Sequence, residues 1–292
     1  MHIGYPKEYP TTCSLPFNHE SLADDFQLSS PDQEPTDEGV WLLLKGQNVF
    51  TITGENGPEL PSGALPVATC ERTPLYIGKW QDRPCRMLIL NGIDTVSDNL
   101  KEQSLHSHNP QIPLAILSLA GVGLMINHWE ESCQFCGYCG KQLVRLPLEW
   151  GKKCGSCNKL HYPRIHPCVI GLIIRGDELL LVRKPEWAEG RYGLVAGFVE
   201  FGESLEEAMV REIEEETGIQ VDNIRYVGSQ SWPFPSQIMN GFVADYVAGE
   251  IKLQEDELEA AGWFKLDQLP SLPPRRSIAR YLIDKAGDYL QP

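Results

Sequence analysis

The segment Gly197–Ile219 constrains this chain more than any other part of its sequence. Ser204 and Glu207 form a capping box, which begins a helix, and Gly218 stands where helices commonly end in a left-handed residue. Apolar side chains recur at helical spacing between these signals and predict one buried face, formed by Leu205, Ala208, Met209 and Ile213. The sequence therefore predicts an amphipathic helix between Ser204 and Gly218.

Three carboxylates of this helix, Glu212, Glu215 and Glu216, share another face. Residues three or four apart on a helix have Cβ atoms about 5 to 6 Å apart, so these charges repel one another unless water or a divalent cation separates them. Oxygen-only ligand sets of this kind suit Mg²⁺ or Mn²⁺. A solvated acidic helix face is the plainer alternative, but it leaves the regular spacing of the glycines, the arginine and the glutamates unexplained.

This spacing is identified as a complete Nudix box: Gly197, five residues, Glu203, seven residues, and then Arg-Glu-Ile-x-Glu-Glu-x-Gly-Ile from Arg211 to Ile219. The resemblance to Nudix hydrolases implies hydrolysis of a nucleoside diphosphate linked to another group. It also implies that the box helix carries the cations for this reaction. General chemistry agrees, because bridging cations polarise phosphorus-bound oxygens and generate hydroxide near neutral pH.

Length and charge narrow the class of protein further. A chain of 292 residues can bury a substantial core, and two domains are the expected number. The net charge of -15 and the pI near 4.9 disfavour extended binding to a nucleic-acid backbone, although a nucleotide or a nucleic-acid end stays compatible. No secretory signal is visible at the N-terminus. The longest apolar stretch, 112–126, is shorter than the roughly 20 residues that a bilayer requires, so we expect a buried helix and a cytoplasmic protein.

Five of the nine cysteines fall within residues 133–157. In a cytosolic chain such clustering indicates a metal site rather than disulfides. Two Cys-x-x-Cys hooks supply the four sulfurs of a closed tetrahedral zinc site: Cys136, Cys139, Cys154 and Cys157. Cys133 competes for the first hook, but the glycines that follow Cys136 and Cys139 favour that pair. The sequence therefore predicts a zinc ribbon with a structural metal, and a redox role for one pair is the weaker alternative.

A zinc ribbon directly before a Nudix box resembles the NADH pyrophosphatase branch of the superfamily, which also hydrolyses the NAD cap on RNA 5′ ends. The segment 229–235, Ser-Gln-Ser-Trp-Pro-Phe-Pro, closely matches the signature of this branch. It departs from the signature at Ser231, where the branch usually has proline. It departs again at Ser236 and Gln237, where the branch has a variable residue followed by serine.

The signature segment is built as a stiff aromatic loop. Pro233 and Pro235 fix φ, and the flat faces of Trp232 and Phe234 suit a nicotinamide or adenine ring. On composition alone, ordinary core or dimer-interface aromatics would be the better interpretation, and the resemblance reverses this preference.

The resemblance also implies a substrate site. Phe198 and Trp232 would sandwich the nicotinamide, while Gln230, Met239 and Ala279 would line the base pocket. The complete set of implied substrate positions is Glu149, Tyr162, Phe198, Gln230, Ser231, Trp232, Pro233, Phe234, Pro235, Ser236, Gln237, Met239 and Ala279.

For the catalytic cations, Mg²⁺ or Mn²⁺, the implied ligands are Glu212, Glu216, Glu257 and the main-chain carbonyl of Ala196. Glu255, Asp256 and Glu259 are alternatives to Glu257. Either Glu215 or Glu216 would orient or deprotonate water. Arg211 is expected to anchor Glu203 through a charge-assisted bond, with direct phosphate contact as the alternative role.

The chain is expected to be an α/β protein with three units. An N-terminal α+β domain spans 1–130, with its first 38 residues loosely ordered, a zinc ribbon spans 131–164, and a Nudix domain spans 165–292. Strands are expected at 40–44, 49–53, 75–80, 85–90, 167–175, 178–183, 191–195, 224–228, 241–248 and 261–266, and a closing helix at 276–286. Their alternation with helices predicts a mixed sheet between helices in the Nudix domain.

The expected reaction is hydrolysis of the diphosphate of NADH or NAD to a nicotinamide mononucleotide and AMP, with NAD-capped RNA as a further substrate. A Nudix pyrophosphatase for another nucleotide such as ADP-ribose is one alternative. A zinc-ribbon protein that only senses nucleotide or binds nucleic acid is the other. The resemblance also suggests a homodimer.

Overall fold

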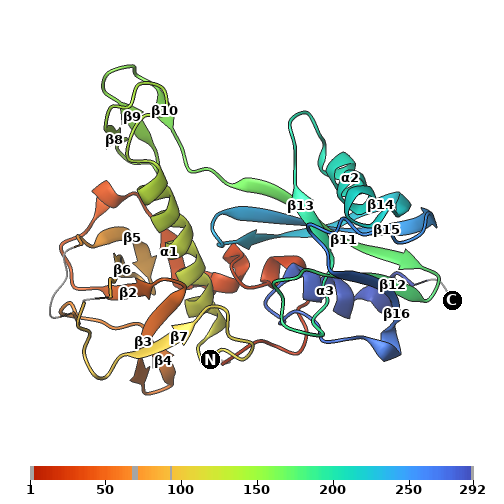
Figure 1. Cartoon of the computed structure of the whole chain (residues 1–292). Coiled ribbons are helices and arrows are strands. Elements are labelled where there is room, and N and C mark those ends of the chain that lie inside the picture. The colour runs from red at the N-terminus through yellow and green to blue at the C-terminus, as the bar shows by residue number, and fades with distance from the viewer. Residues whose placement is uncertain (1–2, 68–71, 93, 291–292) are drawn as a thin grey trace. The chain divides into compact units, whose positions relative to one another are not determined.

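The computed structural model describes residues 3–67, 72–92 and 94–290. These residues fold into two compact units, and neither unit is one continuous stretch of chain (Figure 1). The first unit contains residues 1–5, 16–165 and 232–236, and the second contains 6–15, 166–231 and 237–292.

The first unit is built on a seven-stranded sheet. Its strands are β1 (Phe26–Leu28), β2 (Val40–Lys45), β3 (Asn48–Gly54), β4 (Gly57–Glu59), β5 (Leu75–Trp80), β6 (Arg83–Ile89) and β7 (Lys101–Ser104). The strand order is β1-β5-β6-β2-β3-β4, with β7 also paired to β3. Both hairpins expected from the sequence form, β2 with β3 and β5 with β6, and β2 pairs with β6 in parallel.

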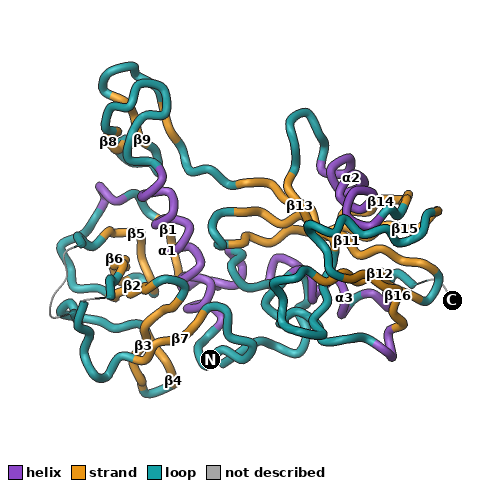
Figure 2. Tube along the Cα trace, viewed as in Figure 1, coloured by secondary structure: helices purple, strands orange, loops and turns teal. Residues whose placement is uncertain are grey.

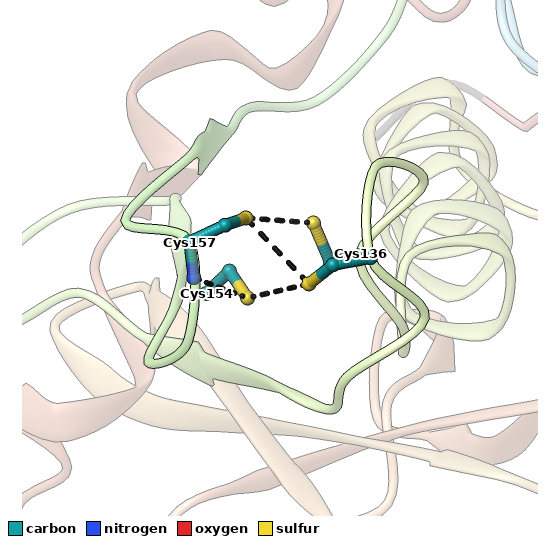
Figure 3. Close-up of side chains that lie close together, drawn as sticks. Cys136, Cys154 and Cys157 are labelled. Atoms are coloured by element: carbon teal, nitrogen blue, oxygen red, sulfur yellow. Dashed lines mark hydrogen bonds between the residues drawn. The ribbon is translucent and has the colours of Figure 1, made fainter.

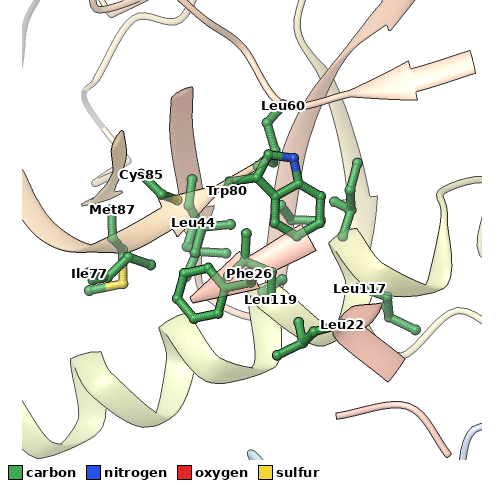
Figure 4. Packing of buried hydrophobic residues seen from close by; sticks show 14 of the residues in the cluster. Leu22, Phe26, Leu44, Leu60, Ile77, Trp80, Cys85, Met87, Leu117 and Leu119 are labelled. Carbon is green, nitrogen blue, oxygen red and sulfur yellow. The ribbon is translucent and has the colours of Figure 1, made fainter. Parts of the chain in front are cut away.

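Helix α1 (Leu114–Ser132) packs against this sheet and extends further than the expected 112–126. Leu117 and Leu119 of α1 meet Leu44, Ile77 and other strand residues in one core (Figure 4). Gly123 lets the helix approach closely, because a Cβ there would lie 2.7 Å from Cδ2 of Leu42. None of the described helices is both long and apolar enough to cross a membrane.

The expectation that the first 38 residues are loosely ordered is wrong from residue 3 onward. These residues form 3-10 turns at Thr12–Ser14, His19–Asp25 and Pro31–Gln33, and β1 joins the sheet. Leu22 and Phe26 are buried in the core of the first unit, and the amide of Phe17 donates to Oγ of Ser118 at 3.0 Å. A few apolar anchors thus order a segment whose average composition is polar.

The four-cysteine segment follows α1 and carries a small sheet of β8 (Leu143–Arg145), β9 (Lys152–Cys154) and β10 (Leu160–His161). Most of this segment is loop (Figure 2). Its apolar core is small and consists of the buried residues Trp129, Cys133, Cys136, Leu143 and Cys154. So little apolar burial indicates that the ribbon depends on its metal site for stability.

The second unit contains a six-stranded mixed sheet. Its elements are β11 (His166–Arg175), β12 (Glu178–Arg183), β13 (Val195–Phe198), α2 (Leu205–Thr217), β14 (Gln220–Trp232), β15 (Gln237–Ala248), β16 (Ala260–Lys265) and α3 (Ile278–Asp284). The order is β14-β15-β11-β12-β16, with β13 also paired to β11. β11 and β15 run parallel, while β11 with β12 and β12 with β16 run antiparallel.

Helices α2 and α3 cover opposite faces of this sheet. A Cβ at Gly171 would lie 2.7 Å from Sδ of Met209 in α2, and a Cβ at Gly241 would lie 2.8 Å from Cδ1 of Ile278 in α3. Gly241 pairs with Ile170, the neighbour of Gly171, and successive strand residues face opposite sides. This arrangement confirms the expected mixed sheet between helices (Figure 1).

Two expected elements of the second unit differ from the structure. The strand expected at 191–195 is a loop with isolated bridges, and the paired strand β13 begins only at Val195. The closing helix is shorter than 276–286, because Ser277 caps its start and Lys285 ends it before a 3-10 turn at Ala286–Asp288.

Candidate active site

The two ends and the buried face of helix α2 determine where its glutamates point. Ser204 accepts a hydrogen bond from the amide of Glu207, whose carboxylate accepts one from the amide of Ser204 at 2.8 Å, so the capping box is complete. Gly218 ends the helix with φ of 71°. Ala208, Met209 and Ile213 are fully buried, as the predicted apolar face requires. The position of this face fixes the direction of every glutamate on the helix.

Glu212 points toward β13 and lies against the backbone of Gly197. A Cβ at Gly197 would lie 2.0 Å from Cδ of Glu212. This glycine is therefore required for the space that the carboxylate occupies. Burial raises the pKa of Glu212. Ala196 precedes Gly197 on the same strand, paired with Ile170 of β11.

Arg211 organises three of the box carboxylates. Its guanidinium donates to Glu203, to Glu212 at 2.8 Å and to Glu215 at 3.0 Å, and Nη2 also donates to the carbonyl of Phe198 at 2.9 Å. The hydrogen bonds from Arg211 lower the pKa of Glu203 to about 2. The arginine is thus committed to four protein groups, which is the anchoring role expected for it.

Glu216 is the most unusual group in the site. Its side chain is 1% exposed, and neither carboxylate oxygen has a hydrogen-bond partner. Burial, aided by the negative charges of Glu212 and Glu257, raises the pKa of Glu216 to about 8. The ammonium of Lys184 lies 3.7 Å from Oε1 of Glu216 and 3.8 Å from Oε2 of Glu257.

The structure separates the acidic alternatives near Glu257. Glu259 forms an ion pair with Arg183, so its carboxylate is already engaged. Glu255, Asp256 and Glu257 are all exposed, so exposure does not separate them. Glu257 is the member of this loop that shares Lys184 with Glu216. The shared ion pair with Lys184 therefore places Glu257 near Glu216 of the box helix.

These carboxylates fit a hard divalent cation. Within the described residues, five of them, Glu203, Glu212, Glu215, Glu216 and Glu257, form ion pairs only with Arg211 and Lys184. A buried carboxylate without hydrogen bonds is costly unless a cation compensates it, and oxygen ligands favour Mg²⁺-like ions. The carboxylate oxygens are less closely gathered than the cysteine sulfurs described below, since Arg211 and Lys184 hold them in separate ion pairs. A cavity of about 520 Å³ lies on the outer side of α2, but it reaches neither Glu212 nor Glu216.

The four predicted zinc ligands come together in the ribbon. The sulfurs of Cys136, Cys139, Cys154 and Cys157 lie within 4.8 Å of one another, and three of these side chains are labelled in Figure 3. The amide of Cys157 donates to Sγ of Cys154, which lowers the pKa of Cys154 to about 6 and favours the thiolate that a metal requires. Cys133 is buried outside this group. Such a closed four-sulfur set is typical of a structural metal.

The signature segment packs within the first unit. Trp232 makes edge-on contacts with Phe17 and Phe234, with ring centroids 5.9 and 5.2 Å apart. Phe234 also lies 4.4 Å from the ring of His106, and Pro233 is buried. Trp232 and Phe234 thus each use part of their surface in the core of the first unit. Phe198, on β13 of the second unit, is 53% exposed.

The other expected substrate positions have varied surroundings. Gln230 is fully buried and uses both ends of its amide on the start of α3, donating to the carbonyl of Arg276 and accepting from the amide of Ile278. Of the remaining positions, Ser236 and Ala279 are buried, Ser231, Gln237 and Met239 are partly exposed, and Glu149, Tyr162 and Pro235 are exposed. Lys184 was not expected in the site, because a lysine after an apolar strand has no sequence signal that distinguishes it from a surface residue.

Two family models match the chain. Residues 164–286 match the model described as "NUDIX domain", and residues 38–129 match one described as "NADH pyrophosphatase-like rudimentary NUDIX domain". With the box helix and its carboxylates in place, the fold and the site are those of a Nudix hydrolase.

Similar proteins define the family more narrowly. A NAD-capped RNA hydrolase NudC of Pectobacterium carotovorum is 42% identical over 231 residues, which cover 77% of this chain and 86% of that protein. A NAD-capped RNA hydrolase NudC of Pseudomonas aeruginosa is 39% identical over 271 residues, covering 90% and 94%. The chain belongs to the NudC family of Nudix hydrolases.

Proposed function

We propose that this enzyme hydrolyses the diphosphate of NADH and NAD to a nicotinamide mononucleotide and AMP, and that it removes the NAD cap from RNA 5′ ends by the same reaction. The observation that carries the proposal is the buried carboxylate of Glu216, which accepts no hydrogen bond from the described residues and lies beside Glu212 and Glu257. A substrate that brings a diphosphate together with divalent cations matches this excess of negative charge. The names of the two relatives supply the nicotinamide dinucleotide and the capped RNA.

The residues divide into distinct roles. Glu212, Glu216, Glu257 and the carbonyl of Ala196 would hold Mg²⁺ or Mn²⁺. When bound, these ions would lower the pKa of water and neutralise charge on the diphosphate. Glu215, which is 55% exposed and held by Arg211, would orient or deprotonate water, with Glu216 as the alternative. Glu203 and Arg211 position the others.

Specificity for nicotinamide would come from aromatic faces. The exposed side chain of Phe198 is free to stack on a flat ring, and Trp232 would supply a second face. Gln230 would act indirectly by fixing the start of α3, which carries Ala279. The remaining positions Glu149, Tyr162, Ser231, Pro233, Phe234, Pro235, Ser236, Gln237 and Met239 stay in the proposed substrate set.

The ribbon would bind Zn²⁺ in a structural role, and the chain would act as a homodimer in the cytoplasm, where thiols stay reduced. The domain boundaries 1–130, 131–164 and 165–292 remain part of this proposal. Two alternatives are kept: a pyrophosphatase for ADP-ribose, and a nucleotide sensor without turnover. The complete set of box glutamates argues against the sensor, and the signature aromatics argue against ADP-ribose.

One assay separates these functions. AMP release is measured in parallel from NADH, NAD, ADP-ribose and NAD-capped RNA, with Mg²⁺ or Mn²⁺ and with a chelator control. We expect cation-dependent turnover with preference for the nicotinamide substrates. Preference for ADP-ribose would support the first alternative. A sensor would bind nucleotide without releasing AMP, and its affinity would survive Glu215→Gln.

A further inference from the structure

Lys184 occupies a position that its sequence context does not explain. It directly follows β12, and its neighbour Arg183 is fixed by Glu259 and by the carbonyls of Lys184 and Trp187. The side chain of Lys184 is 24% exposed and turns toward the carboxylates of Glu216 and Glu257. A surface lysine thus points inward at the proposed cation site.

The ammonium of Lys184 is the positive charge that pairs with Glu216 and Glu257 among the described residues. Arg211 contacts Glu203, Glu212 and Glu215. Among the ion pairs of the described residues, Lys184 is the partner of both Glu216 and Glu257. Its separations of 3.7 and 3.8 Å are those of an ion pair without a hydrogen bond, so the carboxylate oxygens of Glu216 keep their lone pairs free.

We propose that Lys184 is a built-in counter-ion, which holds Glu216 and Glu257 in the absence of divalent cations and is displaced when a cation binds between them. The inference rests on the cation ligands of the proposed function. An ion that coordinates these oxygens at about 2.0–2.1 Å, as Mg²⁺ does, would compete with the ammonium for the space beside the two carboxylates. Like charges at such a distance repel strongly in a partly buried site.

The sign of the effect on affinity follows from this competition. In the cation-free site Lys184 is attracted to two carboxylates. In the loaded site those carboxylates are neutralised and the ammonium faces a positive ion. Lys184 therefore stabilises the free form relative to the loaded form, and it raises the cation concentration at which the enzyme becomes active. Removal of its charge tightens cation binding.

The test measures Mn²⁺ affinity of the full-length, zinc-loaded protein without substrate, by electron paramagnetic resonance of free Mn²⁺ or by calorimetry. Lys184→Gln should bind Mn²⁺ at least about 5-fold more tightly than the natural protein. Lys184→Arg, which keeps the charge, should stay close to the natural affinity. Lys265→Gln is the matched control, because Lys265 forms an ion pair with exposed Asp177 in the same unit.

The melting temperature provides a second test of the inference. Without divalent cations, Lys184→Gln should melt at a lower temperature than the natural protein, and saturating Mn²⁺ should close the gap. Unchanged or weaker Mn²⁺ binding by Lys184→Gln overturns the inference. If Lys184→Gln does not fold, the test depends on Lys184→Arg, which should bind Mn²⁺ as tightly as the natural protein does. Tighter Mn²⁺ binding by Lys184→Arg also overturns the inference. The AMP-release assay tests the reaction itself, so either result can fail without the other.

Discussion

Arg211 donates two hydrogen bonds to the carboxylate of Glu203, from Nε at 2.5 Å and from Nη2 at 3.0 Å. Glu203 precedes the N-cap of α2, and Arg211 lies two turns into the helix. Glu203 also accepts a hydrogen bond from the amide of Glu200 at 2.8 Å. The pair therefore ties the loop after β13 to the helix that carries the box glutamates.

This pair predicts a defined acid sensitivity. The pKa of Glu203 is about 2 in the folded protein against 4.5 as its ordinary value, so the unfolded chain takes up the proton first as pH falls. Stabilisation by Glu203 is fully present above about pH 5 and is lost between about pH 4.5 and pH 2. Urea unfolding should show Glu203→Gln less stable than the natural protein at pH 7, with the difference shrinking across this window. A difference that is independent of pH would contradict the prediction.

Gly197→Ala should disable the site while sparing the fold. The added Cβ would lie 2.0 Å from Cδ of Glu212, so the carboxylate must move. A displacement of about 1 Å at a catalytic group can cost about 100-fold in rate, and we expect a loss of AMP release of this order. Gly287→Ala is the control, because a Cβ there meets only Leu266, at 3.9 Å. Natural activity in Gly197→Ala would show that Glu212 does not need its observed position.

Substitutions of the glutamates on α2 should have different effects, depending on the helix face that carries each residue. Glu215→Gln should lower kcat by about 10² to 10⁴-fold, the usual effect of losing a general base. Glu216→Gln should lose Mn²⁺ affinity as well as activity, because its carboxylate is a proposed ligand. Glu214→Gln is the matched control, since Glu214 is exposed on the same helix and forms no ion pair within the described residues. Similar losses of activity in Glu215→Gln, Glu216→Gln and Glu214→Gln would show that the helix faces do not differ in function.

Cysteine substitutions should distinguish the ligands from their neighbour. Cys136→Ser should release zinc and lower the melting temperature, because the ribbon has few buried apolar residues to hold it without metal. Cys133→Ser should keep the full zinc content, since Cys133 lies outside the group of four sulfurs. Zinc content by atomic absorption and thermal unfolding check both variants. Retention of zinc with normal melting in Cys136→Ser would refute the four-cysteine site.

Phe198→Ala tests stacking with little risk to the fold, because the side chain is 53% exposed. Loss of one base–aromatic contact is worth about 1 to 3 kcal/mol, so kcat/KM for NADH should fall by about 5 to 150-fold. Hydrolysis of ADP-ribose, which lacks the nicotinamide, should change less. Equal losses on both substrates would assign Phe198 a role outside nicotinamide recognition.

The parts of the fold that depend on neighbouring residues in the sequence could be predicted. The capping box at Ser204, the left-handed Gly218 and the two cysteine hooks are local signals, and each appears in the structure as expected. Hairpins β2–β3 and β5–β6 were predictable for the same reason.

Features that depend on distant partners could not be predicted. The N-terminal segment has a polar composition, and nothing local shows that Leu22 and Phe26 reach a core or that Phe17 meets α1. Lys184 lies 32 residues before Glu216 and carries no motif, so only the folded chain reveals their contact. The relation of residues 38–129 to a rudimentary Nudix domain was also missed, because that region lacks the box.

The division of the chain has a consequence for its synthesis. The first unit takes residues 232–236, and Pro233 there packs against the helix position of Gly121. Domains commonly fold as they leave the ribosome, N-terminal first. Here the first unit lacks residues 232–236 until translation has passed the box helix α2 and most of β14. A nascent chain stopped after the ribbon therefore exposes an unfilled site on α1, and the first unit reaches its final form only after synthesis of the second unit is well under way.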